Sequence, residues 1–135
     1  MIASIRSAEA FGITELFLIG DIDINTWKVN HISKGTIKHI KITKFKDSEQ
    51  CINYLIKNKI NIVVVENTSD SDLITNYEFK SDIAIVMGNE CIGVPREFLN
   101  YDIVKIPQYG LCKCLNTTVA VSIVMYERFK QSLKI

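Results

Sequence analysis

Short β-branched runs alternate with amphipathic stretches of helical length along the chain. Four apolar runs predict buried strands at residues 16–19, 61–65, 83–87 and 103–106. Helical periodicity lies before the first run, between the first and second runs, and after the fourth. This alternation is typical of a parallel sheet covered by helices, so the predicted fold class is α/β.

The first two helices are predicted from their apolar faces and end signals. Ile2, Ile5 and Ala8 share one helical face ahead of Gly12, which suits the left-handed position just past a helix end. Asp47 is suited to cap a second helix. The apolar stripe of that helix consists of Cys51, Ile52, Leu55 and Ile56.

The last predicted helix, over residues 114–130, is apolar on two sides. One side carries Val119, Ile123, Tyr126 and, beyond the helix, Leu133; the other carries Val121, Val124 and Met125. A helix of this kind usually packs on both sides. One contact is expected with the sheet. The other is expected with a partner subunit or, equally, with a surrounding part of the same subunit.

Composition limits the classes of protein that fit. A chain of 135 residues with 47% hydrophobic residues and a net charge of +1 predicts one folded domain, residues 1–135. No apolar run reaches membrane-span or signal-peptide length, so we expect a cytoplasmic protein without a membrane partner. The four cysteines lack a CxxC pair, so we expect reduced thiols and no metal site.

Positive charge is concentrated in residues 28–46, which contain six lysines, two histidines and no carboxylate. A basic segment on an otherwise acidic chain can contact phosphates. Lysines also protect an exposed edge strand from pairing with other chains, and composition alone leaves both interpretations open.

Three motifs follow one another along the chain. They read ASIRSAEAFG at residues 3–12, IVMGNECIGVP at residues 85–95, and IPQYG at residues 106–110 followed by CLNTTVA at residues 114–120. In this order they resemble the motifs of the SpoU/TrmH family of RNA ribose 2′-O-methyltransferases, in the SPOUT superfamily. The resemblance covers essentially the whole chain, and HISKGT at residues 31–36 is similar to a turn before the family's third strand.

The resemblance implies a SPOUT-type parallel sheet with a deep trefoil knot near the C-terminus. It also implies a first strand ending in an asparagine six residues before the motif arginine. Counting back six positions from Arg6 passes Met1, so this strand is expected to be missing. A start placed too late, a short form with its sheet edge covered otherwise, and a decayed copy are the three interpretations.

The resemblance further implies that S-adenosylmethionine binds at Gly88, Ile106 and Leu115, with Gln108 and Cys114 as neighbours. Elementary topology agrees, since ligands of open α/β sheets collect at the carboxyl ends of strands. The structural alternative is that Gly88 ends a strand and the two aliphatic residues belong to the core. Cys114 stands where the family has serine, and a thiol is a weaker hydrogen-bonding group.

Arg6, Glu90 and Asn116 match the family's catalytic positions. Arg6 would lower the pKa of the ribose 2′-hydroxyl electrostatically and orient a phosphate. Glu90 would hold Arg6 or a substrate hydroxyl. Asn116 suits either catalysis or the capping of the last helix, and Arg6 would otherwise be a surface residue beside Glu9.

The predicted function is S-adenosylmethionine-dependent methyl transfer to a ribose 2′-hydroxyl of tRNA or rRNA by a homodimer. RNA phosphates would be contacted by the basic segment, through Lys28, Lys34, Lys38 and Lys41. The alternative is a non-catalytic knotted protein that binds RNA or another partner. A general nucleotide-binding domain is disfavoured because the chain lacks GxGxxG and GxxxxGK[ST] loops.

Overall fold

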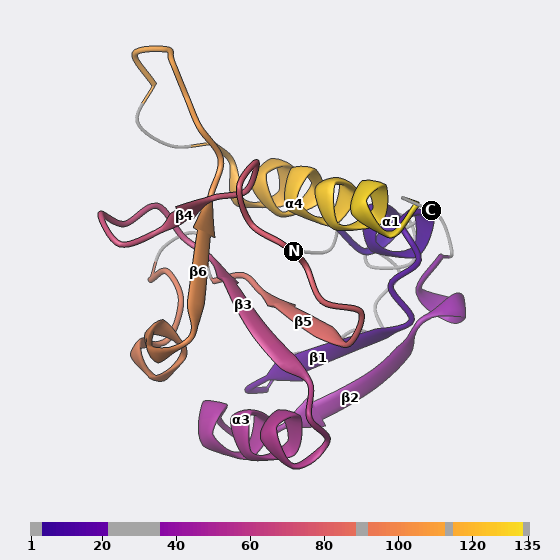
Figure 1. Cartoon of the computed structure of the whole chain (residues 1–135). Coiled ribbons are helices and arrows are strands. Elements are labelled where there is room, and N and C mark those ends of the chain that lie inside the picture. The colour runs from indigo at the N-terminus through magenta and orange to yellow at the C-terminus, as the bar shows by residue number, and fades with distance from the viewer. Residues whose placement is uncertain (1–3, 22–35, 89–91, 113–114, 134–135) are drawn as a thin grey trace.

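The computed structural model describes residues 4–21, 36–88, 92–112 and 115–133 (Figure 1). Strands and helices alternate along these segments except where β3, β4 and β5 follow one another. In chain order the elements are α1 (Ser4–Ala10), β1 (Glu15–Ile19), the 3₁₀ helix η1 (Thr36–His39), β2 (Lys41–Phe45), α3 (Ser48–Lys57), β3 (Asn61–Val65), β4 (Asp72–Leu73), β5 (Ile83–Val86), the 3₁₀ helix η2 (Arg96–Asn100), β6 (Asp102–Lys105) and α4 (Thr117–Ser132).

The strands form two sheets in which every pairing is parallel. Four strands pair in the order β4-β6-β3-β5, and β1 pairs with β2. Asn61 of β3 lies opposite Ile83 of β5, and Val63 of β3 lies opposite Asp102 of β6. This arrangement confirms the predicted α/β class with parallel strands.

One apolar layer joins both sheets beneath α3. Buried residues of α3, β3 and η2 form its centre, including Leu55, Val64 and Phe98. Phe17 from β1 and Val86 from β5 pack against the same cluster, so the two sheets share one layer under this helix. Figure 1 shows α3 on one side of the strands and α1 and α4 on the other.

The predicted stripe on α3 is correct except at its edge. Cys51, Ile52 and Leu55 are buried, whereas Ile56 is exposed. Ile56 is rotated by about 100° from Leu55 and lies in the last turn of the helix, where it faces solvent. Including Ile56 in the core was therefore wrong.

The opposite face of the four-stranded sheet packs against α4. Val63 and Val104 from the sheet form a second core cluster with Val124. The three residues of the predicted inner side of α4, Val121, Val124 and Met125, are all buried. On the predicted second side, Val119, Ile123 and Tyr126 remain 49%, 38% and 50% exposed. The Tyr126 ring packs edge-to-face against Phe11, just after α1, with ring centroids 5.5 Å apart, so α1 covers part of that side and the rest stays open in the described chain.

Local signals set the start of α3 and the end of α1 where the sequence predicts them. The Asp47 carboxylate accepts a hydrogen bond from the Gln50 backbone N–H at 3.0 Å, which caps α3. Gly12, just after α1, has a φ of +80° and lets the chain turn into β1.

In the segments that the structure describes, no helix combines the length and apolarity needed to cross a bilayer.

Candidate functional site

The loops after β3 and β5 meet at the carboxyl ends of the central strands. The loop after β5 folds back on Gly88 so closely that a Cβ there would lie 2.2 Å from the carbonyl carbon of Gly93 and 2.4 Å from the nitrogen of Val94. Gly93 itself has a φ of +79°, and a Cβ on it would lie 3.5 Å from Oε2 of Glu66, just after β3. Only glycine fits at position 88, because any side chain would enter neighbouring backbone.

Hydrogen bonds hold the loop after β3 in a defined shape. The Ser71 hydroxyl donates to the Glu66 carbonyl at 2.8 Å and accepts from the Thr68 backbone N–H at 2.9 Å. The Lys105 ammonium donates to the Thr68 carbonyl at 3.4 Å, and the Glu66 N–H donates to the Val104 carbonyl at 3.1 Å. The last two of these hydrogen bonds therefore hold this loop against the end of β6.

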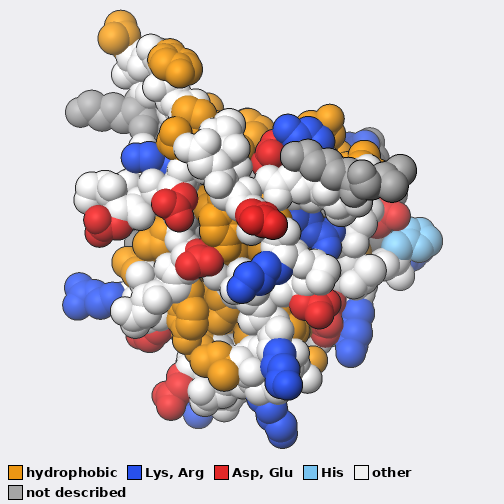
Figure 2. Space-filling view, in the orientation of Figure 1, with side chains coloured by type: hydrophobic (Ala, Val, Ile, Leu, Met, Phe, Trp, Pro, Cys, Tyr) orange, Lys and Arg blue, Asp and Glu red, His pale blue; other side chains and the backbone are white. Residues whose placement is uncertain are grey.

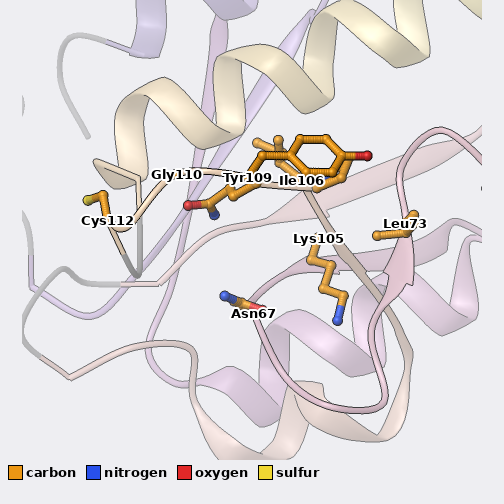
Figure 3. A pocket seen from close by; sticks show the side chains of 9 residues that line it. Asn67, Leu73, Lys105, Ile106, Tyr109, Gly110 and Cys112 are labelled. Carbon is orange, nitrogen blue, oxygen red and sulfur yellow. The ribbon is translucent and has the colours of Figure 1, made fainter.

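A pocket of about 370 Å³ opens between the loop after β3 and the segment after β6. In the view of Figure 3, Lys105 lies between Asn67 and Leu73. Among the described residues its lining contains no carboxylate, and Lys105 is its cationic side chain. The lining residues are Asn67, Leu73, Lys105, Ile106, Pro107, Gln108, Tyr109, Gly110 and Cys112.

The first turn of α1 lies at the end of β5. The Ser4 hydroxyl is 4.0 Å from Sδ of Met87, the residue directly before Gly88. Arg6 follows two residues later and is exposed. The fold thus brings the first motif next to the second, although 83 positions separate Ser4 from Met87.

Asn116 caps the last helix. Its side-chain oxygen accepts hydrogen bonds from the Thr118 backbone N–H at 2.9 Å and the Val119 backbone N–H at 3.4 Å. The helix therefore begins at Thr117, three residues later than the sequence predicts. Capping, one of the two predicted roles of Asn116, is confirmed.

Comparison with protein families decides the relationship. Residues 3–126 match the SpoU rRNA Methylase family. The chain belongs to this family. It is 31% identical over 126 residues to the tRNA (guanosine(18)-2′-O)-methyltransferase of Borreliella burgdorferi, covering 92% of this chain and 57% of that protein.

Solved structures of methyltransferases share the fold. An AdoMet-bound rRNA methyltransferase from Sinorhizobium meliloti matches with a TM-score of 0.89 and 25% identity, over 98% of this chain and 52% of the other. The SpoU methyltransferase AviRb from Streptomyces viridochromogenes, in complex with AdoMet, matches with a TM-score of 0.87 and 23% identity, over 98% and 55%. The chain spans little more than half of each of these relatives.

The residues expected to bind the cofactor, together with Glu90, fall into three groups by their place in the structure. Ile106 and Gln108 lie together in the pocket, and Gly88 forms the neighbouring close approach. Leu115 is partly exposed and lies outside the pocket lining, although it directly precedes the cap of α4. Glu90 and Cys114, with Cys91, lie outside the described residues.

Arg6 and the described lysines lie on neighbouring elements. Within the described segments Arg6 forms no ion pair with Glu9. Lys38 belongs to η1, which packs against α1, and its side chain is exposed. Lys41, at the start of β2, is exposed and lies 3.6 Å from the Glu15 carboxylate. Lys28, Lys34 and the HISKGT turn lie outside the described residues.

The sequence interpretation missed Asn67, Lys105 and Tyr109 as lining residues. The rule that ligands collect at the carboxyl ends of strands, which supported Gly88, also applies to Asn67, because Asn67 closely follows the buried strand β3. The described residues contain no group of three side chains suited to hold a metal ion. Burial raises the pKa of the Cys51 thiol to about 11, so this thiol stays protonated and unreactive at neutral pH.

Proposed function

We propose that this chain is the catalytic domain of an S-adenosylmethionine-dependent RNA ribose 2′-O-methyltransferase. The observation that carries the proposal is the backbone approach at Gly88 beside a pocket lined by Ile106 and Gln108. Ligands of parallel α/β sheets bind at this end of the strands. Relatives named as a tRNA 2′-O-methyltransferase and as an AdoMet-bound rRNA methyltransferase support the same assignment.

The cofactor would lie between the segments after β5 and β6. Gly88 would admit it close to the backbone, and Ile106 would pack against the adenine. Gln108 can both donate and accept hydrogen bonds at the rim, and Leu115 and Cys114 would complete the contacts. When bound, S-adenosylmethionine supplies a methyl group activated by the sulfonium.

Arg6 would act on the ribose of the substrate. A guanidinium keeps its proton at ordinary pH, so Arg6 would stabilise the developing alkoxide and orient a neighbouring phosphate. Transfer of that methyl group would convert the 2′-hydroxyl to a methyl ether, and the proton that the hydroxyl loses would leave to a base or to water. Glu90 and Asn116 would position these groups.

RNA would approach over α1 and η1. Arg6 and Lys38 are exposed on these packed elements, and Lys41 follows at the start of β2. With Lys28 and Lys34 they would contact phosphates of tRNA or rRNA, so binding should weaken as salt concentration rises. The edge-protection role of Lys41 and Lys44 on β2 is compatible with this.

A homodimer would cover the open side of α4. Val119, Ile123 and Tyr126 present an apolar stripe there, and Tyr109 and Leu111 stand fully exposed beyond β6. Figure 2 shows apolar side chains at the tip of a loop that projects from the body of the molecule. Exposed apolar surface of this extent is typical of an interface. The C-terminal segment would pass through a loop of the same chain to form the knot that the family resemblance implies.

The first test is calorimetric titration of the purified chain with S-adenosylmethionine and S-adenosylhomocysteine. We expect micromolar binding that is lost in Ile106→Asp and retained in Ile56→Asp, a matched change at an exposed position. Transfer of a labelled methyl group to tRNA or rRNA would then follow. Absence of binding by the folded wild-type chain would contradict a catalytic role and favour a non-catalytic RNA-binding protein.

A further inference from the structure

The pocket between the loop after β3 and the segment after β6 has an apolar part and a polar part. Ile106 and Pro107 supply apolar surface, whereas the side chains of Lys105 and Asn67 supply polar groups. Figure 3 shows the Lys105 side chain extending away from Ile106 and Tyr109, toward the level of Asn67. The volume of about 370 Å³ lies within the range of roughly 300–1,000 Å³ that is typical of small-molecule sites. A ligand that fills this pocket therefore meets apolar groups along one part and a cation at another.

Strand pairing fixes the place from which Lys105 extends into the pocket. Lys105 is the last residue of β6 and lies opposite Leu73 of β4 in the parallel register. Its carbonyl accepts a hydrogen bond from the Ile74 backbone N–H at 3.0 Å. Register partners place their side chains on the same face of a sheet, so the aliphatic stem of Lys105 lies beside Leu73, which also lines the pocket. The ammonium can therefore reach the loop after β3 while the stem stays packed.

The charge of the Lys105 ammonium has little compensation within the described chain. The residue is half-buried, and its hydrogen bond to the Thr68 carbonyl is long, at 3.4 Å. In the described segments it forms no ion pair, and none of the described lining residues carries a carboxylate. An ammonium has three N–H donors, so two of them have no protein partner in this part of the chain. Because an uncompensated charge is costly away from water, the pocket favours a ligand with an anionic group at this point.

Asn67 offers an amide in the same pocket as this cation. The Ser71 hydroxyl bonds to the Glu66 carbonyl and to the Thr68 N–H, on either side of Asn67, so the backbone at Asn67 is held in place. The Asn67 backbone N–H donates to the Glu66 carboxylate at 3.3 Å, and within the described segments its side-chain amide has no hydrogen-bond partner. A side-chain amide both accepts and donates. It can therefore bind an ammonium group of a ligand whose carboxylate lies at Lys105.

We propose that Lys105 and Asn67 bind the amino-acid end of S-adenosylmethionine. The Lys105 ammonium donates to the carboxylate of the cofactor, and the Asn67 side-chain oxygen accepts from its α-ammonium. The reverse orientation brings two ammonium groups together and is disfavoured by their repulsion. The adenine then lies toward Ile106. This inference rests on the proposed function, and it adds two binding residues that lie outside the three sequence motifs.

The test is calorimetric titration of the full chain with two ligands that differ only in the carboxylate, S-adenosylhomocysteine and its decarboxylated analogue. Both ligands keep the adenosine, the thioether and the amino group. The wild-type chain should bind S-adenosylhomocysteine at least about tenfold more tightly than the analogue. Lys105→Met should weaken S-adenosylhomocysteine by about tenfold and bind the analogue at least as well as the wild type does. Lys105→Arg keeps a cation and should retain much of the preference.

Two further variants complete the comparison. Lys57→Met is the matched control, because Lys57 is exposed on α3 and lies outside the pocket lining, and it should leave both affinities unchanged. Asn67→Ala should weaken both ligands, since both carry the amino group, and should leave the ratio of their affinities nearly unchanged. Unchanged affinity for both ligands in Asn67→Ala would contradict the role of Asn67.

The outcomes separate this inference from the proposed function. If the wild-type chain binds S-adenosylhomocysteine without preferring it to the analogue, or if Lys105→Met weakens both ligands equally, the inference is wrong and the proposed function stands. If the wild-type chain binds neither ligand and no S-adenosylmethionine, the proposed function fails and the inference fails with it. The comparison of the two ligands in the wild type requires no substitution, so it decides the question even if Lys105→Met does not fold.

Discussion

Gly88 and Gly93 approach each other so closely that a Cβ on Gly88 would lie 2.2 Å from the carbonyl carbon of Gly93. Gly88→Ala must therefore displace the loop after β5, at a cost of about 1–3 kcal/mol in unfolding free energy. Binding of S-adenosylmethionine should weaken at least tenfold, by calorimetry. Gly12→Ala is the control, because its positive φ makes alanine costly to stability while a Cβ there meets nothing within 4 Å and the residue lies outside the pocket lining. Equal binding of S-adenosylmethionine by the two variants would contradict the role given to the close approach.

The two roles of Asn116 can be separated by substitution. Asn116→Ala removes the acceptor for the Thr118 and Val119 N–H groups and should lower stability by about 1 kcal/mol, measured by urea denaturation. Asn116→Asp keeps an acceptor and should retain most of that stability. If Asn116 also acts in catalysis, methyl transfer by the aspartate variant will fall far more than its stability does. Full activity of the aspartate variant would assign Asn116 to capping alone.

Tyr77 links stability to alkaline pH. Its hydroxyl donates to the Asp102 carboxylate at 2.6 Å and accepts from the Asn61 side-chain amide at 3.3 Å. Burial, followed by the bond to Asp102, raises the pKa of Tyr77 from 10 to about 12. The unfolded chain therefore loses this proton first, and the stability that the phenol contributes is lost as pH rises from about 10 to about 12.

Denaturation curves between pH 9 and pH 12 test this link. Tyr77→Phe should flatten the alkaline decline, while the buried Cys51 thiol, with a pKa raised to about 11, still contributes to it in both proteins. An unchanged decline in Tyr77→Phe would show that the raised pKa of Tyr77 does not control alkaline stability.

We expect a dimer, formed through the exposed apolar side chains of α4. Ile123→Glu places a charge in the exposed apolar stripe and should convert a dimer to a monomer in sedimentation, with little loss of helical circular dichroism. Ile56→Glu, an equally drastic change at an exposed position of α3, on the other side of the strands from α4, is the control. Wild-type chain that sediments as a monomer at high micromolar concentration would rule out this interface.

The hydrophobic pattern predicted where strands lie along the chain better than it predicted which strands pair. The run at residues 61–65 matches β3 because a central parallel strand is apolar on both faces. β2 was not predicted as a buried strand, because Lys41 and Lys44 interrupt an edge strand that needs only one apolar face. The order β4-β6-β3-β5 and the separate pairing of β1 with β2 depend on tertiary packing, which no local pattern encodes.

The same reasoning applies to the site. The family resemblance nominated Ile106 and Gln108, and their position after a strand, at the end where ligands collect, agrees with that nomination. The closeness of Glu66 to Gly93 could not be predicted from the sequence. It brings together two loops, and hydrogen bonds between residues apart in the chain set the shape of the loop after β3.

The exclusively parallel pairing also sets how quickly the chain can fold. The shortest separation between paired strands joins Asn61 to Ile83, and Val63 pairs with Asp102 much farther along the chain. No hairpin is available among the described strands to close early at low entropic cost, so each pairing must wait for a long loop to close. β3 is therefore made before either of its partner strands, and its apolar faces stay uncovered until β5 and β6 have followed it along the chain.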